Sequence, residues 1–344
     1  MAENQTVNWG IIGPGKIANQ FAQAVVENPE CCLLGVASRD NTRASSFAEK
    51  YDIARTYSTY ESMCADDEID AVYIATPHAL HYQQAKLCLE AGKHVLVEKP
   101  ATINANQWKV LVQIAQKNQC ALIEAVWSRF MPCFKQVKSW LSEGLLGDLV
   151  YVQSDIGFSF LDVRGVNHEH RLLNPDLGGG ALLDLGLYSV ALSQLVVNSQ
   201  PSEIQAMAHM GSSSVDLTTM ANVRYANGVR AQFTCSAMAE HTNTMSIHGT
   251  RGKITLPQLF WFGGQAILEY LPKDSEDAVT ISESFTHDVN GFEYQIAESV
   301  RCIKSGLIES ELMTHQNTLE NMQLMDEIRN KISLSYPSTI ENSD

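Results

Sequence analysis

The stretch VNWGIIGPGKIANQF, residues 7–21, predicts the fold of the N-terminal half of the chain. Its first six residues form a short apolar run that is typical of a buried strand. The run leads into a turn that fits the pattern G-x-G-x-x-A, made of Gly13, Pro14, Gly15, Lys16, Ile17 and Ala18. Glycines allow a tight turn, and the start of the following helix presents free N–H groups to a pyrophosphate. Because strand, turn and helix follow in this order, we predict a dinucleotide-binding unit.

The end of the second predicted strand, residues 33–37, indicates which dinucleotide is bound. Enzymes that use NAD carry an acidic residue at this place for the ribose hydroxyls. Here Ser38 and Arg39 follow the strand, and the arginine favours the 2′-phosphate of NADP, with Arg43 as a second cation. The alternative is that Asp40 only N-caps the next helix and that Arg39 is solvated. The pattern favours NADP over NAD.

Strands and helices alternate over residues 7–125, which predicts an α/β fold with a doubly wound parallel sheet. In such sheets the carboxyl ends of the strands line the ligand crevice. The strand HVLV, residues 94–97, is followed by Glu98, Lys99 and Pro100. A lysine at this place can reach a bound substrate, and the proline fixes the backbone that aims it. The alternative is a surface lysine after a buried strand.

A second polar segment, TPHALH at residues 76–81, follows the strand predicted at residues 69–75. We assign Thr76, Pro77, His78 and His81 to the wall beside the nicotinamide, because they follow the carboxyl end of a strand. The two histidines could instead suggest a metal ion. No carboxylate or cysteine joins them nearby, so a metal site is the minority interpretation.

The second half predicts an α+β domain with an open, largely antiparallel sheet of about six strands and helices on one face. Strand-like runs occupy residues 150–154, 204–210, 220–225, 229–235, 244–248, 253–256 and 266–270, and Asn227-Gly228 is a hairpin signal. We place a cofactor domain at residues 1–126 and a substrate and dimerisation domain at 127–335. The helices predicted at 292–305 and 315–332 could pack back on the first domain.

The stretch GGGALLDLGLY, residues 178–188, predicts a second group of site residues. Three glycines leave room for a ligand and open a helix, and Asp184 and Tyr188 lie on one helical face. A carboxylate and a phenol that share a pocket can act as an acid/base pair, although a hydrogen bond between them inside a core is the alternative. His168, His170 and Arg171 belong to a polar loop that could line the substrate site. A metal ion there would need further ligands.

Composition excludes several classes of protein. The net charge of −15, from 39 acidic and 24 basic residues, argues against nucleic-acid or anionic-membrane partners. The N-terminus lacks the pattern of a signal peptide, and no apolar run is expected to reach the roughly 20 residues of a membrane span. Eight cysteines without a C-x₂-C pair indicate reduced thiols in the cytoplasm and no structural zinc. The polar tail at residues 338–344 is expected to fray.

Three of these motifs resemble those of one enzyme family. The G-x-G-x-x-A turn, Glu98-Lys99-Pro100 and GGGALLDLGLY occur in the order and spacing of the glucose–fructose oxidoreductase/inositol dehydrogenase (Gfo/Idh/MocA) family. Ser38-Arg39-Asp40, AVYI at 71–74, EAVWSRF at 124–130 and Tyr188 are similar to the branch of dimeric dihydrodiol dehydrogenase and NADP-dependent D-xylose dehydrogenase. Residues 158–175 are less similar to the dihydrodiol enzymes, so the substrate stays open.

The resemblance implies an N-terminal Rossmann domain and a C-terminal domain whose exposed sheet face makes a homodimer. It implies that Lys99 lies near the nicotinamide, often before a cis peptide, that Tyr188 is the acid/base, and that Asp184 positions the substrate. The expected cofactor contacts are Gly13, Pro14, Gly15, Lys16, Ile17, Ser38, Arg39, Arg43, Thr76, Pro77, His78, His81, Glu98, Lys99 and Trp127. The expected substrate contacts are Trp127, Arg129, Phe158, His170, Arg171, Asp184 and Tyr188.

The expected function is an NADP(H)-dependent oxidoreductase that transfers hydride to or from a secondary alcohol or carbonyl of a sugar or cyclic diol. Tyr188 would move the hydroxyl proton while Lys99 hydrogen-bonds the same oxygen. The alternative is a non-catalytic NADP-binding sensor or regulatory protein on the same fold, against which the presence of Lys99, Asp184 and Tyr188 counts. For the homodimer, the residues expected to form the apolar face are Val223, Tyr225, Val229, Ala231 and Phe233.

Overall fold

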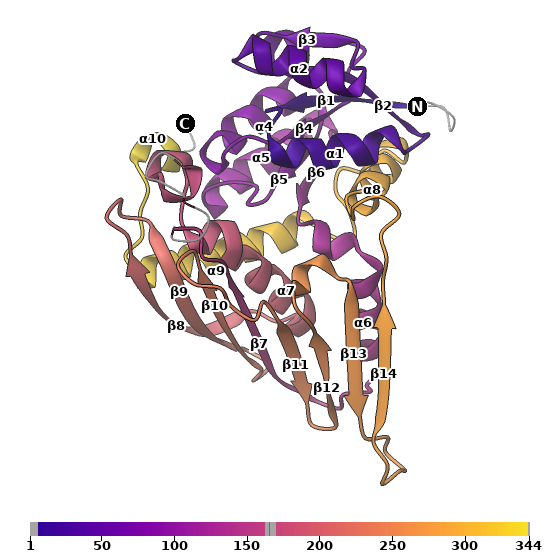
Figure 1. The fold of residues 1–344 in the computed structure, drawn as a ribbon, viewed down its shortest axis with the longest axis vertical. Helices are drawn as coiled ribbons and strands as arrows, with labels where there is room; N and C mark the ends of the chain where they lie inside the picture. Colours follow the sequence, from indigo (N-terminus) through magenta and orange to yellow (C-terminus); the bar gives the residue numbers. More distant parts are fainter. Residues whose placement is uncertain (1–5, 162–164, 166–169, 343–344) are drawn as a thin grey trace. The chain divides into compact units, whose positions relative to one another are not determined.

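The computed structural model describes residues 6–161, 165 and 170–342, which form two compact units (Figure 1). The first unit takes the chain up to Phe130, the segment His287–Leu319 and the residues from Ile340 onward. The second unit takes Met131–Thr286 and Glu320–Thr339. One sheet has six strands and the other has eight, and the predicted fold class is confirmed.

The sheet of the first unit is entirely parallel. Its strands are β1 (Val7–Ile12), β2 (Cys31–Ala37), β3 (Arg55–Tyr57), β4 (Ala71–Ile74), β5 (His94–Glu98) and β6 (Leu122–Ala125). Their order is β3-β2-β1-β4-β5-β6, so the direction of winding reverses between β1 and β4. Ligands of open α/β sheets bind outside the carboxyl ends of the strands at such a switch point.

Helices cover both faces of this sheet. They are α1 (Lys16–Val26), α2 (Asn41–Tyr51), α3 (Tyr60–Cys64), η1 (His78–Leu80), α4 (His81–Glu90), α5 (Ala105–Asn118), η2 (Trp127–Phe130) and α8 (Glu293–Lys304). Because β1–α1–β2 and β4–α4–β5 wind in opposite directions from the switch point, right-handed crossovers place α1 and α4 on opposite faces. The ring of Phe21 on α1 stacks on Tyr73 of β4 at 3.8 Å, inside the core.

The sheet of the second unit has eight strands, one more than the seven strand-like runs identified in the sequence. They are β7 (Leu149–Gly157), β8 (Pro201–Met210), β9 (Asp216–Tyr225), β10 (Arg230–Ser236), β11 (Met245–Gly249), β12 (Gly252–Leu256), β13 (Gln265–Tyr270) and β14 (Val279–Ser284). Their order is β14-β13-β12-β11-β7-β10-β9-β8, antiparallel except for the pair β7–β10. The sequence does not predict β14, because its residues are mainly polar and half exposed.

Helices pack against one face of this second sheet (Figure 1). The helices of this unit include α6 (Pro132–Ser142), η3 (Arg171–Leu173), η4 (Pro175–Leu177), the π-helical turn η5 (Leu182–Gly186), α7 (Leu187–Val197) and η6 (Phe260–Phe262). The turn η5 contacts β10, helix α7 contacts β7, and helix α6 contacts β13. The long helix α9 (His315–Lys331) begins in the first unit and continues in the second.

The residues expected to form the exposed dimer face point the other way. Val223, Tyr225, Val229, Ala231 and Phe233 are each no more than 3% exposed, because they form the core under the helices. The side chains that alternate with them along β9 and β10, among them Asn222, Arg224 and Gln232, are exposed. The prediction that the apolar set makes the open face is therefore wrong, and that face is polar.

Two smaller expectations also need correction. The helical run at residues 175–197 is long and apolar enough to cross a membrane, with a mean hydropathy of 1.6 over an 18-residue window, contrary to the expectation that no run reaches this length. However, 89% of that window is buried inside the protein, and core helices pass the same test. This run is therefore weak evidence for a membrane span.

The C-terminal tail does not fray over its described part. Residues Ser338–Glu341 form the short helix α10, whose backbone is bound by side chains at the start of α5. Asn104 Nδ2 donates to the carbonyl oxygen of Glu341 at 2.9 Å, and Gln107 Nε2 donates to that of Ile340 at 2.6 Å. Hydrogen bonds from buried side chains explain why a polar tail is ordered here.

Candidate active site

The two glycines of the turn after β1 have different surroundings: Gly13 is packed against the chain, whereas Gly15 faces open space. Gly13 has a φ of +89°, and a Cβ there would lie 2.7 Å from Thr76 Cγ2, so the turn can approach the end of β4 only with glycine. A Cβ on Gly15 would meet nothing closer than the carbonyl oxygen of Gly13 at 3.9 Å. Lys16 and Ile17 are exposed, while Pro14 is buried. The space above the start of α1 therefore fits a pyrophosphate.

At the end of β2, Asp40 caps helix α2. Its Oδ1 atom accepts hydrogen bonds from the N–H groups of Thr42 at 2.9 Å and Arg43 at 3.2 Å, and Ser38 Oγ accepts from Asp40 N–H. The capping alternative is therefore confirmed for Asp40, whose carboxylate is engaged with the helix. Arg39 is exposed beside it, and its contact with a cofactor stays a prediction.

A depression of about 290 Å³ lies between the glycine-rich turn and one face of α2. It is lined by Pro14, Thr42, Arg43, Ser46, Phe47 and Lys50. Lys50 Nζ donates to Asn19 Oδ1 at 2.7 Å, which holds its charge near the start of α1. Two cations in one depression suit a phosphate group. Lys50 was not predicted from the sequence, although its spacing of seven residues from Arg43 places both on one helical face.

The segments that follow β4 and β5 are joined by one buried histidine. His81 Nδ1 lies 2.8 Å from the carbonyl oxygen of Pro100, and His81 Nε2 lies 2.8 Å from that of Thr76. Burial, with the neighbouring His78 as a smaller contribution, lowers the pKa of His81 to about 4. The Thr76 hydroxyl donates to Gln84. These contacts give His81 a structural role, and the cofactor contacts expected for Thr76, Pro77, His78 and His81 stay predictions.

The Lys99 segment is held by carboxyl groups. Tyr73 Oη donates to Glu98 Oε1 at 2.5 Å, and Glu98 Oε2 accepts the N–H of Lys99 at 3.2 Å. The Lys99–Pro100 peptide bond is cis, as the family resemblance implies. Both carboxylate oxygens of Glu98 therefore bond within the first unit, and its contact with a cofactor stays a prediction.

Glu124 at the end of β6 is fully buried, and its Oε1 atom accepts the N–H of Ala101 at 2.9 Å. Burial raises the pKa of Glu124 to about 7, while the Ala101 N–H, the Thr318 hydroxyl and the charge of Arg129 oppose the rise. The sequence analysis did not assign this residue to the site. The available signal was a glutamate in an otherwise apolar strand.

Trp127 and Arg129 follow β6 in the first unit, and both are buried. The Trp127 ring lies 5.1 Å from that of Phe292. Arg129 Nε donates to the carbonyl oxygen of Leu312 at 3.0 Å, and its Nη2 donates to Asn317 Oδ1 at 2.9 Å. These bonds give Arg129 a structural role, and the substrate contacts expected for both residues stay predictions.

In the second unit, Asp184 lies in the π-helical turn and is 6% exposed. Arg171 binds it through both nitrogens, with Nη1–Oδ1 and Nη2–Oδ2 distances of 3.1 Å. His170 Nδ1 accepts the N–H of Leu172, and burial lowers the pKa of His170. His168 lies outside the described residues. Arg171 therefore neutralises Asp184 and fixes its orientation.

The three glycines before this turn accommodate the chain rather than a ligand. A Cβ on Gly179 would lie 2.7 Å from the carbonyl oxygens of Arg171 and Leu172, and one on Gly180 would lie 2.2 Å from Asp216 Oδ1. Asp216 in turn accepts the N–H of Leu182, at the start of the π-helical turn. The expectation that the glycines leave room for a ligand is therefore wrong at these two positions.

Tyr188, one turn after Asp184, belongs to an aromatic group. Its ring stacks on Trp261 with centroids 5.9 Å apart and an interplanar angle of 27°. Phe158 packs edge-on against Trp261 at 5.9 Å and against Phe160 at 5.7 Å. Trp261 was not predicted from the sequence, although three consecutive aromatic residues at 260–262 before a glycine were a visible signal. The group offers a flat apolar wall beside the phenol.

We searched the described residues for side chains that could bind a metal ion. Among residues 6–161, 165 and 170–342, no group of three or more histidine, cysteine or acidic side chains is placed to hold a metal ion.

The raised pKa of Glu124 predicts a specific dependence of stability on pH. Between the unfolded value of 4.5 and the folded value of about 7, the native state binds more protons, so stability is lost as the pH rises through this window. Glu124→Gln removes the titrating group. The free energy of unfolding of this variant should therefore rise relative to that of the wild type as the pH increases, by up to about 3 kcal/mol.

Melting temperatures of the two proteins, measured in parallel from pH 4.5 to 8, test this. The comparison is needed because the protonation of His81 has the opposite effect on the stability of the protein. The stability that depends on neutral His81 is lost as the pH falls from 6.5 towards its pKa of about 4. Both proteins share that contribution. A difference in melting temperature that does not change with pH would contradict the prediction.

Comparisons with known proteins address the family. Residues 7–126 match the model of an oxidoreductase family with an NAD-binding Rossmann fold (GFO_IDH_MocA), and residues 134–255 match the Gfo/Idh/MocA C-terminal domain. Trans-1,2-dihydrobenzene-1,2-diol dehydrogenase from Bos taurus is 32% identical over 336 residues, which cover 96% of this chain and 98% of the relative. The Homo sapiens protein of the same name is 30% identical, with the same two coverages.

Solved structures agree with this result. A 3-ketoreductase from Actinomadura kijaniata, crystallised with NADP and TDP-benzene, has a TM-score of 0.84 and 25% identity over 95% of this chain and 98% of its own. An aldose-aldose oxidoreductase from Caulobacter crescentus has a TM-score of 0.84 at 21% identity, over 96% of this chain and 98% of its own, which shows the shared fold. Both family domains and relatives over nearly the full length therefore show that this chain is an oxidoreductase of the Gfo/Idh/MocA family.

Proposed function

We propose that the protein is an NADP(H)-dependent oxidoreductase that transfers hydride to or from a secondary alcohol or carbonyl of a sugar or cyclic diol. The observation that carries the proposal is the Tyr188 phenol, stacked on Trp261 and one turn from an Asp184 carboxylate that Arg171 fixes. Relatives named as diol dehydrogenases, and a similar 3-ketoreductase crystallised with NADP, support it.

The choice of NADP rests on the cations around the depression beside α2. A nicotinamide cofactor supplies the hydride chemistry when it is bound, and the protein supplies its placement. The start of α1 at Gly15 would receive the pyrophosphate, while Arg43 and Lys50 line the depression and Arg39 lies exposed at the end of β2. Asp40 uses its Oδ1 atom to cap α2, which supports Arg39 rather than Asp40 as the residue that contacts the ribose side of the cofactor.

For the chemical step, Tyr188 gives a proton to the substrate oxygen or removes it, and Lys99 hydrogen-bonds the same oxygen. Trp261 restricts the phenol ring by stacking on it. Asp184 acts as an orienting group and not as a free base, because Arg171 binds both of its oxygens. The hydrogen bonds of Glu98 and His81 hold the backbone that aims Lys99.

The proposed class of substrate follows from the aromatic group around Tyr188 and from the charge of the residues beside it. Phe158 and Trp261 offer flat apolar surfaces that suit the face of a carbocycle or a pyranose. The charge of Asp184 is already matched by Arg171, so a neutral polyol or ketone fits better than a charged acid. These features support a sugar or a cyclic diol and do not separate the two.

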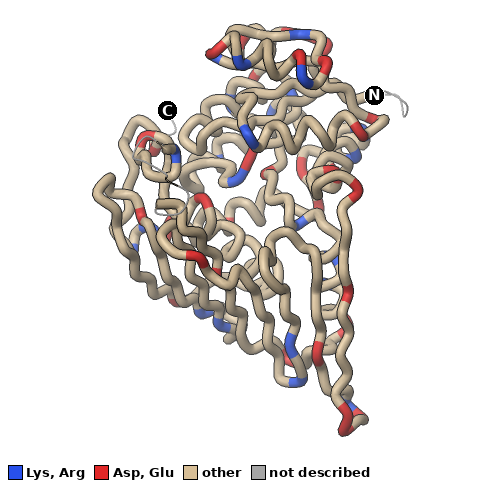
Figure 2. Tube along the Cα trace, viewed as in Figure 1, with Lys and Arg blue, Asp and Glu red and all other residues tan. Residues whose placement is uncertain are grey.

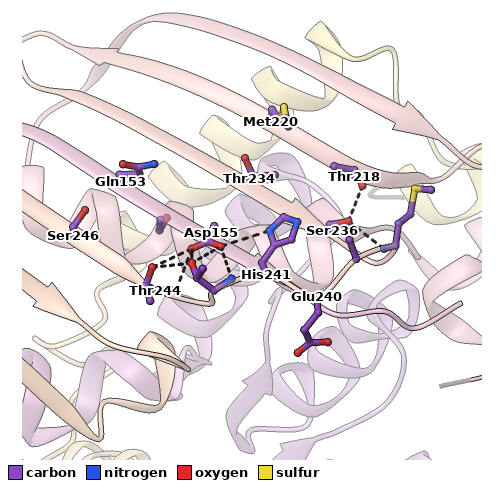
Figure 3. Close-up of a pocket in the computed structure, with 14 residues that line it drawn as sticks. Gln153, Asp155, Thr218, Met220, Thr234, Ser236, Glu240, His241, Thr244 and Ser246 are labelled. Carbon is purple, nitrogen blue, oxygen red and sulfur yellow. Dashed lines mark hydrogen bonds and ion pairs between the residues drawn. The ribbon is translucent and has the colours of Figure 1, made fainter. Parts of the chain in front are cut away.

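For assembly, we propose a homodimer through the open face of the eight-stranded sheet. This face carries a depression of about 1000 Å³, in which none of the predicted cofactor or substrate residues lies. Figure 3 shows Asp155 turned toward Thr244 and His241, while Glu240 points away. Asp155 accepts hydrogen bonds from the N–H groups of Thr242 and Thr244, so it anchors the loop before β11 and is not available to a ligand.

The remaining surface of this face suits a second copy of the chain. The strands carry few charged positions along their length (Figure 2), and Lys253 pairs with Glu269 within the face. Met207 and Met220 are opposite each other on β8 and β9 and are 67% and 46% exposed, so together they form an exposed apolar patch. We also place the protein in the cytoplasm, a proposal supported by eight free cysteines.

The cofactor prediction is that NADPH binds more tightly than NADH. A charge-assisted hydrogen bond to the 2′-phosphate contributes roughly 1.5–3 kcal/mol, or about 10–150-fold in Kd. Arg39→Ala should remove most of this preference and leave NADH binding nearly unchanged. Titration of both cofactors tests it, and equal dissociation constants for the wild type would refute the preference.

The chemical prediction begins with a search for the substrate. NADPH oxidation or NADP reduction, followed by absorbance, is measured on a panel of sugars, cyclic diols and dicarbonyls. Tyr188→Phe should keep cofactor affinity and lose roughly 10²–10⁴-fold in kcat. Lys99→Met should also lose activity, and the double variant should be little worse than the worse single one. Near-normal turnover by Tyr188→Phe would dismiss the assignment, and a panel without any turnover would favour the NADP-binding sensor.

The assembly prediction concerns the exposed methionines. We expect a dimeric mass by light scattering at micromolar concentration, and a shift toward monomer in Met220→Arg, because a buried unpaired charge opposes association. Val26→Arg is the matched control, since Val26 is an exposed apolar residue of the first unit. A monomeric wild type, or loss of the dimer in the control alone, would count against this interface.

A further inference from the structure

The backbone between β5 and α5 makes an unusual set of hydrogen bonds. Pro100 has no N–H, so Lys99 and Ala101 provide the donors that flank it. The N–H of Lys99 binds Glu98 Oε2, and the N–H of Ala101 binds Glu124 Oε1. The Pro100 carbonyl oxygen lies 2.8 Å from His81 Nδ1. Three ionisable side chains from β5, β6 and α4 therefore hold this segment. Within a sheet, the backbone groups of neighbouring strands would provide these hydrogen bonds instead.

Glu124 differs from the other two because it is a fully buried carboxyl group that accepts a hydrogen bond from the N–H of Ala101. Its side chain is fully enclosed, and taking a carboxyl group out of water costs several kcal/mol unless it is paired. The apolar strand residues around it, Leu122, Ile123 and Ala125, would favour an apolar side chain at this position. Its hydrogen bond is made to the first N–H after the proline, two residues from the lysine.

We propose that Glu124 is a positioning residue, which holds the N–H of Ala101 and thereby fixes the direction in which Lys99 points. The inference rests on the proposed role of Lys99 in the chemistry. Glu124 need not touch the substrate or the cofactor. What the segment requires of it is a hydrogen-bond acceptor at one place, and a neutral amide can provide that as well as a carboxyl group.

This requirement separates two substitutions of similar size. Glu124→Gln keeps a carbonyl oxygen for the Ala101 N–H, whereas Glu124→Met fills the same space without an acceptor. Because methionine leaves no large cavity and removes a buried acid, the second variant should fold. We expect kcat within about threefold of the wild type for Glu124→Gln and a loss of about tenfold or more for Glu124→Met, since small misplacements of a reacting group are costly.

The KM for the cofactor should change less than kcat in either variant, because the glycine-rich turn that would hold the pyrophosphate is not part of the segment fixed by Glu124. Hydrogen exchange of the peptide at residues 97–104, followed by mass spectrometry, reports the segment directly and needs no substrate. The peptide should exchange faster in Glu124→Met and at the wild-type rate in Glu124→Gln.

A matched control is Asp70→Leu. Asp70 Oδ2 accepts the N–H of Asn8 at 2.8 Å, so this variant also removes a carboxylate that binds a backbone N–H. It does so just before β4 begins, at the opposite end of the strand from the predicted site. We expect a lower melting temperature with kcat near that of the wild type.

Each result decides a separate point. Glu124→Met with kcat near the wild type, or Glu124→Gln as impaired as Glu124→Met, overturns the positioning role. An equal loss of kcat in Asp70→Leu would overturn it too, because general destabilisation would then explain the effect. If the wild type turns over nothing, the proposed function fails, and the exchange rates alone decide whether Glu124 holds the segment.

Discussion

A backbone group that leaves a parallel sheet has to find a new partner, because a buried unpaired N–H or carbonyl costs about 1–3 kcal/mol. At the carboxyl ends of β4 and β5 these partners are the side chains of Glu98, Glu124 and His81. The same bonds that satisfy the backbone also fix the peptide that carries Lys99. Stability and the geometry required by the proposed chemistry therefore depend on one set of interactions.

Local patterns predict most of the first unit. Strand β1 spans the predicted residues, because it depends on a short apolar run beside a clear turn signal. The bond from Ala101 to Glu124 joins residues 23 positions apart, and no local pattern encodes it. The sequence indicates that Glu124 is unusual for its strand. It does not indicate which N–H the carboxyl group will bind.

In the second unit, the sequence predicts the positions of the strands better than it predicts which face of the sheet is covered by helices. Alternation along β9 and β10 separates Val223 and Phe233 from Asn222 and Gln232, but it does not say which set the helices will cover. The covering helices, α6 and α7, come from other parts of the chain. Their position is settled by the whole apolar area that can be buried, which is larger on the side of Val223 and Phe233. The polar side is left open, with Met207 and Met220 as its exposed apolar residues.

The GGGALLDLGLY stretch combines a correct prediction with a wrong reason. Asp184 and Tyr188 do lie one turn apart, yet the glycines serve to pack the chain against its own carbonyl oxygens and against Asp216. A π-helical turn then places Asp184 where Arg171 can bind both of its oxygens. Because this pairing removes the net charge beside Tyr188, the proposed recognition of a substrate by the second unit would rest mainly on the aromatic wall of Tyr188, Trp261 and Phe158. A neutral ring would gain from that wall by contact area, while its hydroxyl groups find the few polar atoms that remain.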